Sequence, residues 1–227
     1  VPFGLTARQM DAWMEHGNGR KLMDEFYAQY NIKSLSAGNT GTQMGGWYRK
    51  EIRSVEDLKG LRMRVPNIPL YTNFAKECGI SGQPMPFAEV PGALDQGVID
   101  GGDSPLADIV SLKMYEITPE ITLTGHILVI HSLYINDKFY QSLPAEDKKW
   151  FDEAAKRSAN DVWAMVKEGD EKAKATILAN KGHINTPGKE FHDYMAEAGK
   201  RSWKLFYDTV PNCQAILDSA ASYRESK

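Results

Sequence analysis

Apolar positions along the chain recur with two spacings, one typical of helices and the other of strands. Helical spacing, bounded by capping residues or glycine, predicts helices over residues 7–16, 20–30, 70–78, 89–96, 145–180 and 189–209, and a short one after Pro211. Alternating or continuous apolar runs predict strands over residues 32–37, 61–65, 98–100 and 127–135. Strands that alternate with helices indicate an α/β fold with parallel strand pairing.

Three further stretches add detail to this prediction. A helix over residues 145–180 would be about 50 Å long, which is longer than an ordinary domain is wide, so we expect it to brace two lobes. Residues 38–46 are rich in glycine and predict a loop between the first strand and Trp47. Ser104 is followed by Pro105, a pair typical of a helix start with Ser104 as the N-cap.

Composition and charge narrow the classes of function. The chain has 227 residues, of which 42% are hydrophobic and 25% charged, and a formal net charge of −3. It lacks the concentrated positive charge that attracts nucleic acid or anionic membranes. The longest apolar run, residues 126–135, is far shorter than the roughly 20 residues of a membrane-spanning helix. Cys78 and Cys213 are too few for a disulfide framework or a Cys-x-x-Cys metal site, and we interpret them as structural.

The common signatures of enzymes are missing from the sequence. It contains no Gly-x-Ser-x-Gly, His-Glu-x-x-His or dinucleotide-binding motif. Gly41 and Gly46 have the spacing of two P-loop glycines, but Trp47 and Tyr48 stand where a P-loop needs lysine and serine or threonine. These observations favour binding over catalysis. The alternative is an enzyme acting on a small acid, with Asp103 or His126 transferring a proton.

Arg64 is the sharpest candidate for a ligand contact. It lies at the end of the strand predicted over residues 61–65, and ligands of open α/β sheets collect at the carboxyl ends of strands. Its guanidinium group presents a planar fork of donors that matches both oxygens of a carboxylate. The competing interpretation is an ion pair with a surface carboxylate. Gln43 can donate from its amide to a second ligand oxygen, and Asn67 lies two residues after the strand end.

The remaining candidates each have a structural alternative. Asp103 and Ser104 precede a predicted helix, whose free N–H groups favour either an anion or a polar cap. Trp47 is interpreted either as the wall of a pocket or as part of the core. His126 and His131 are five residues apart in a predicted strand and therefore face opposite sides, which does not suit a shared metal ion.

Several longer motifs resemble one known family. The segments "RSVEDLKGLRMRVPNIPLY", "VPGALDQGVIDGGDSPLADI", "TLTGHILVIHSLYIN" and "FYQSLPAEDKKWFDEAA" resemble the solute-binding proteins of tripartite ATP-independent periplasmic (TRAP) transporters. The opening "VPFGLTARQMDAW" and the stretch "GNTGTQMGGWYRKEI" are most similar to the branch that binds 2-oxo and related monocarboxylic acids.

The resemblance implies a two-lobed periplasmic-binding-protein fold of type II-like architecture that closes on an organic acid and delivers it to a TRAP membrane permease. Arg64 matches the carboxylate-binding arginine of the family, and Gln43 matches the glutamine that helps to hold the same carboxylate. We therefore expect a periplasmic protein without catalysis and without a cofactor. A ligand-binding sensor that contacts a receptor is the alternative within the same class of pocket.

The sequence departs from the family pattern at two places near the expected site. Many members have Asn, and the oxo-acid branch Trp, where this chain has Ser104. That branch can also bind a metal ion through an acidic residue matching Asp103 and a second one near Ile127, which is apolar here, so no metal is predicted. The substrate-binding candidates are therefore Arg64, Gln43, Asp103, Ser104, Trp47, Asn67 and His126.

The resemblance also divides the chain into lobes. Residues 1–41 and 129–169 are assigned to the first lobe, the latter including the start of the long helix. Residues 42–128 are assigned to the second lobe, and residues 170–227 to the end of the long helix, the second lobe and the C-terminal helices. Family members have a further part of the first lobe before the residue that matches Val1.

Overall fold

The computed structural model describes residues 2–210 and 212–226, except for the side chains of residues 42–45 and 225. The described chain forms two compact units. Unit 1 contains the residues up to Phe3, Thr42–Ile127 and Glu168–Asp208. Unit 2 contains Gly4–Gly41, Leu128–Lys167 and the residues from Thr209 onward.

The predicted helices are confirmed, and their ends agree to within two residues. The α-helices are α1 (Ala7–His16), α2 (Gly19–Ala28), α3 (Pro69–Glu77), α4 (Val90–Asp95), α5 (Leu106–Ser111), α6 (Asp137–Ser142), α7 (Ala145–Ala179), α8 (Lys189–Thr209) and α9 (Gln214–Glu225). Short 3₁₀ helices are η1 (Val55–Leu58), η2 (Phe87–Glu89) and η3 (Met114–Glu116). Among the described residues, no helix has both the length and the apolar character needed to cross a membrane.

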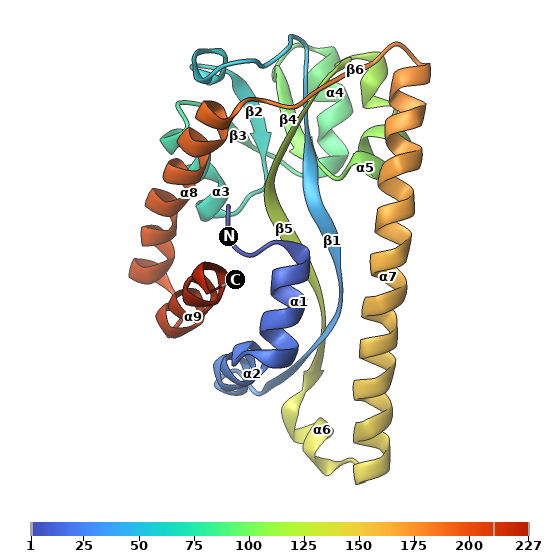
Figure 1. Ribbon diagram of the computed structural model, residues 1–227, viewed down its shortest axis with the longest axis vertical. Coiled ribbons are helices and arrows are strands. Elements are labelled where there is room, and N and C mark those ends of the chain that lie inside the picture. The colour runs from blue at the N-terminus through green and yellow to red at the C-terminus, as the bar shows by residue number, and fades with distance from the viewer. Residues whose placement is uncertain (1, 211, 227) are drawn as a thin grey trace. The chain divides into compact units, whose positions relative to one another are not determined.

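The strands form one sheet in the order β3-β2-β4-β1-β5-β6 (Figure 1). Their bounds are β1 (Ile32–Tyr48), β2 (Arg62–Val65), β3 (Ser81–Pro84), β4 (Gly101–Ser104), β5 (Glu120–Asn136) and β6 (His183–Asn185). As predicted, β2 pairs in parallel with both β3 and β4, and β5 with β6. In contrast, β1 is antiparallel to β4. The chain is therefore α/β, with a mixed sheet.

The glycine-rich stretch is not the loop that we predicted. It belongs to β1, and residues Gly45 to Tyr48 pair with β4. The glycines of β4 serve the neighbouring aromatic residues, because a Cβ atom at Gly102 would overlap the Trp47 ring and one at Gly101 would overlap Tyr48. Small residues on one strand thus make room for large rings on the next.

The prediction of a strand over residues 98–100 is also wrong, because β4 begins only at Gly101. The backbone N–H groups of Val98 and Ile99 donate to the carbonyl of Ala93 and close the end of α4, so they are not available for a ladder. Ser104 is likewise not an N-cap, because it is the last residue of β4 and Pro105 is the N-cap residue of α5.

Two apolar clusters form the core of unit 1, and adjacent residues of β1 divide between them. Tyr48 belongs to the cluster that also contains residues of α3 and α8, including Phe74 and Met195. Trp47 belongs to the cluster that contains residues of α4, α5 and α7. Because successive side chains of a strand point to opposite faces, this division places helices on both faces of the sheet.

Unit 2 contains α1, α2, α6, the first part of α7 and α9, together with parts of β1 and β5. Helix α9 contacts α1 and α2, and the Trp13 indole N–H donates to Ser219 at 3.0 Å. The residues from Thr209 onward, which include α9, therefore belong to unit 2. The match of these units to the two family lobes stays a prediction.

Candidate functional site

Arg64 lies on β2 of unit 1, the strand between β3 and β4, and has the buried residues Met63 and Val65 on either side of it in the sequence. Its side chain is half-buried, its Nε donates to the carbonyl of Met85 at 3.2 Å, and its guanidinium carbon lies 5.2 Å from the centre of the Phe87 ring. In the part of the chain that the structure describes, the guanidinium forms no ion pair with a carboxylate. Its two terminal nitrogens are therefore available as a donor fork.

Arg62 lies two residues earlier on the same strand and has a different environment. It is exposed, and its Nε donates to Asp100 Oδ2 at 3.0 Å. The same carboxylate oxygen accepts from the Arg62 backbone N–H at 3.0 Å. The hydrogen bond from the Arg62 side chain lowers the pKa of Asp100 below its usual range, although partial burial opposes this. The ion pair with a surface carboxylate, which was the alternative interpretation of Arg64, is thus formed by Arg62 instead.

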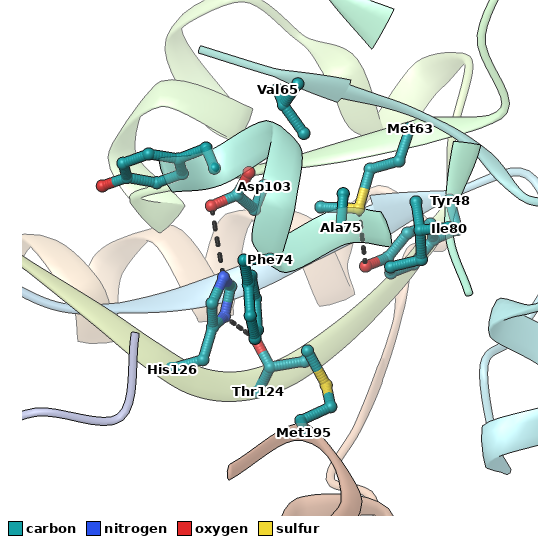
Figure 2. A pocket seen from close by; sticks show the side chains of 11 residues that line it. Tyr48, Met63, Val65, Phe74, Ala75, Ile80, Asp103, Thr124, His126 and Met195 are labelled. Atoms are coloured by element: carbon teal, nitrogen blue, oxygen red, sulfur yellow. Dashed lines mark hydrogen bonds and ion pairs between the residues drawn. The ribbon is translucent and has the colours of Figure 1, made fainter. Parts of the chain in front are cut away.

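A small cavity of about 20 Å³ lies beside the end of β4 (Figure 2). Asp103 and His126 line it with exposed fractions of only 6% and 4%. The His126 Nε2 lies 3.5 Å from Asp103 Oδ2, and its Nδ1 lies 2.7 Å from Thr124 Oγ1. The imidazole also stacks on the Phe74 ring at a centroid distance of 5.6 Å. Thr124 and Phe74 therefore fix the ring that faces the aspartate.

Arg64, Asp103 and Tyr71 are electrostatic neighbours. Burial lowers the pKa of Arg64, and the charge of Asp103 and the nearby Tyr71 oppose this effect. Burial and the Asp103 charge raise the pKa of Tyr71 to about 12, and the positive charge of Arg64 works in the other direction. Tyr71 also lines the cavity. Tyr71 and Asp103 thus share the cavity, whereas Arg64 leaves the sheet on the face that carries Trp47 and acts on them only through its charge.

Trp47 and Ser104 lie outside this cavity. Trp47 is fully buried, and its indole N–H donates to Ser104 Oγ at 3.0 Å. The Ser104 hydroxyl, with 3% of the residue exposed, in turn lies 3.3 Å from the carbonyl of Pro105. The interpretation of Trp47 as part of the core agrees with this environment. Ser104, which departs from the family pattern, therefore accepts the hydrogen bond of a buried indole.

Asn67, another predicted site residue, is not among the described residues that line the cavity. Asn67 is exposed and lines a separate open groove along α3, together with Pro69 and Thr72. The side chain of Gln43 lies outside the described residues, so its proposed contact with the acid stays a prediction.

A metal ion of the kind that the resemblance suggested does not fit the described residues. Ile127, near the position of the second acidic ligand, is buried and has no donor atom. No group of three or more His, Cys, Asp or Glu side chains suited to a metal occurs in residues 2–210 and 212–226. We therefore assign no chemistry to a metal here.

Tyr71 and Thr124 line the cavity but were not among the substrate-binding candidates. Tyr71 is the third residue of α3, and that helix begins four residues after the end of β2, so its nearness to Arg64 was a detectable signal. Thr124 is two residues before His126 on β5, and alternation along a strand places both on the same face. Both signals depend on recognising the strand ends correctly.

The chain belongs to the DctP family of bacterial extracellular solute-binding proteins (family 7), whose model matches residues 1–209. It is 66% identical to a TRAP periplasmic solute-binding protein from Desulfovibrio desulfuricans, solved with bound sn-glycerol-3-phosphate, with a TM-score of 0.86 over 100% of this chain and 73% of that one. A TRAP periplasmic solute-binding protein from Pseudoalteromonas atlantica, solved with sodium and pyruvate, is 32% identical, with a TM-score of 0.85 over 100% and 69%.

A curated relative from a Nostoc species is named a monocarboxylate 2-oxoacid-binding periplasmic protein, and it is 46% identical over 45% of this chain and 28% of its own length. The chain spans about half the length of several other curated relatives that it matches. Family membership confirms the predicted class, a periplasmic TRAP solute-binding protein rather than an enzyme. It also confirms the predicted α/β binding-protein fold.

Proposed function

We propose that the protein captures a small organic acid through the Arg64 guanidinium and delivers it to a TRAP membrane permease. The observation that supports this most is the environment of Arg64, a half-buried cation on β2 with no ion-paired carboxylate among the described residues. A charge that is partly removed from water is costly unless an opposite charge meets it. An acid group on the ligand supplies that charge, and a bidentate pair fixes its orientation.

Capture and release need two states of the protein with different affinities for the acid. In the proposal, the ligand contacts the closed form better than the open form and therefore shifts the equilibrium toward closure. Closure itself is inferred from the family resemblance. Arg64 anchors the acid, and contacts made only in the closed form decide how strongly it is held.

The proposal covers two kinds of acid group. Carboxylates are the class expected from the sequence, and the protein from Pseudoalteromonas atlantica was solved with pyruvate. A phosphate monoester is the second, because the protein from Desulfovibrio desulfuricans, 66% identical to this chain, was solved with sn-glycerol-3-phosphate. The donor fork of arginine matches both groups. No observation favours the sensor alternative, and it is not part of the proposal.

A thermal-shift screen of small carboxylates and phosphate monoesters tests the proposal. A ligand at a hundred times its dissociation constant stabilises the folded protein by about 2.7 kcal/mol. We expect at least one acid to stabilise the wild type and the Arg62→Ala variant but not Arg64→Ala. Glycerol, which has no acid group, serves as the neutral control. The proposal fails if no acid stabilises the wild type or if Arg64→Ala responds equally.

A further inference from the structure

The segment that follows β3 contacts the guanidinium group of Arg64 at two points. β3 runs parallel to β2, and the Met85 backbone N–H continues this pairing by donating to the carbonyl of Val65 at 3.2 Å. The Met85 carbonyl in turn accepts from Arg64 Nε at 3.2 Å. Pro86 then leads into η2, whose first residue, Phe87, has its ring centre 5.2 Å from the guanidinium carbon. Two residues of one short segment therefore contact the same cation.

The ring of Phe87 is itself held by the core of unit 1. Phe87 is partly buried and packs against the apolar cluster that contains Trp47, Val90 and Leu94. Arg64 leaves the sheet on the face that carries Trp47, so the core, the ring and the guanidinium lie on the same side of β2. An aromatic side chain has only two rotatable bonds, and packing against the core restricts both. A rigid ring therefore lies against a long and flexible side chain.

Fixing an arginine side chain has an entropic cost, because it has many rotamers in solution. If the guanidinium moves freely before binding, the acid must bring this cost into the binding step, and affinity falls. The hydrogen bond at Nε and the ring against the flat face of the group restrict it in advance. Neither contact uses the two terminal nitrogens, which form the donor fork for an acid group.

We propose that Phe87 is a positioning residue of the acid site, which holds the guanidinium of Arg64 against its ring so that the donor fork is in place before the acid arrives. This inference rests on the proposed function, because it takes Arg64 as the anchor of the acid. At Arg62, the carboxylate of Asp100 both fixes the guanidinium and neutralises it. A ring fixes the guanidinium of Arg64 and leaves its charge for the ligand.

The first test measures the motion of both arginines in the protein without ligand. After labelling with isotopic arginine, NMR relaxation of the Nε–H groups reports how freely each guanidinium moves. We expect Arg64 to be ordered in the wild type and in Phe87→Tyr, which keeps the ring, and clearly more mobile in Phe87→Leu. Arg62 is the internal control and should be unchanged in all three proteins, because Asp100 holds it.

The second test measures the consequence for binding by isothermal titration with an acid that stabilises the wild type. Phe87→Leu should weaken the affinity by roughly two- to tenfold, which corresponds to ordering one long side chain on binding. Phe87→Tyr should keep most of the wild-type affinity. Combined with Arg64→Lys, Phe87→Leu should cost less than it does alone, because the ring acts through the guanidinium.

Ile117→Ala is the matched control for packing. Ile117 follows η3 and packs against the same apolar cluster as Phe87. This variant should lower the free energy of unfolding, measured with denaturant, and leave both the motion of Arg64 and the affinity for the acid unchanged. If it weakens binding as much as Phe87→Leu does, general loosening of the core is the cause and the positioning role is wrong.

Two further outcomes overturn the inference. Unchanged order of Arg64 in Phe87→Leu does so whatever the affinity, and a loss of affinity with unchanged order would mean that the ring contacts the ligand itself. An equal loss of affinity in Phe87→Tyr and Phe87→Leu also contradicts it, since only one of them removes the ring. If Arg64→Ala binds the acid as the wild type does, the proposed function fails, and the NMR measurement still shows separately whether Phe87 holds the guanidinium.

Discussion

Arg62 and Arg64 have the same side chain and lie two residues apart on one strand, but they differ in what neutralises them. Arg62 is exposed and pairs with Asp100 within the protein. Arg64 is half-buried and has a carbonyl and an aromatic ring as its partners among the described residues. The exposed pair is complete without a ligand. The buried cation is not, and this difference identifies the residue for binding more clearly than its position at a strand end.

Two consecutive residues of β4 show the same contrast. Ser104 accepts a hydrogen bond from the buried indole of Trp47, so its polar atom is satisfied inside the core. Asp103 points to the other face of the strand, where it lines the small cavity and its Oδ2 lies 3.5 Å from the His126 Nε2. One strand therefore places one polar side chain in the core and the next at a cavity.

The largest expected effect is the loss of acid affinity when Arg64 is replaced. Arg64→Ala should weaken binding of the acid by about 3 kcal/mol or more, over a hundredfold, because the acid group then has no opposite charge. Arg62→Ala should leave the dissociation constant almost unchanged. Isothermal titration of both variants measures this. Equal losses of affinity would show that general positive charge, rather than one guanidinium, attracts the ligand.

A smaller effect is expected on stability at Ser104. Ser104→Ala should lower the free energy of unfolding by about 1–3 kcal/mol, because the buried Trp47 indole N–H loses its acceptor. Ligand affinity should not change. Denaturant unfolding of Ser104→Ala, Trp47→Phe and the double variant forms a cycle, in which the second change should cost less after the first. Strictly additive costs would mean that the two side chains are not coupled.

Replacing the guanidinium group of Arg64 with an ammonium group should have a more modest effect on ligand affinity. Arg64→Lys keeps the positive charge but loses the planar fork, so we expect affinity to fall by roughly tenfold, about 1.4 kcal/mol. The matched change Arg62→Lys should have no measurable effect on binding. Titration of both variants with the same acid decides this. Wild-type affinity in Arg64→Lys would mean that charge alone is recognised.

The smallest expected effect concerns the stability of the protein at low pH and depends on the ion pair between Arg62 and Asp100. The folded-state pKa of Asp100 lies below its usual value, so its contribution to stability is fully present above pH of about 4 and is lost as pH falls through the folded pKa. The difference in Tm between wild type and Asp100→Asn should therefore shrink below that pH. If the Tm difference stays constant down to the lowest pH measured, the ionised Asp100 carboxylate is not its cause.

The sequence predicted local features more successfully than pairing between distant strands. Helix α8 has the predicted bounds, and α7 differs by one residue, because amphipathic spacing and caps are local signals. The glycine-rich stretch was misjudged because its extended form depends on pairing with β4, more than fifty residues away. Ser104 was misjudged for the same reason, since its partner is a residue of β1.

The candidate site was predictable to a similar extent. Arg64 could be identified because its strand and the proline after it are visible in the sequence. The contact between Asp103 and His126 could not, because it depends on how β4 and β5 are placed in the folded sheet. Nor does sequence alone show which of two neighbouring arginines is already paired.

A crystal structure of the protein with an acid that stabilises it is the most direct test of the role of Arg64. We expect the acid group to lie within hydrogen-bonding distance of the Arg64 guanidinium, roughly 2.7–3.2 Å, while Arg62 remains paired with Asp100. An acid bound elsewhere, with the guanidinium still directed only to Met85 and Phe87, would contradict the proposed function.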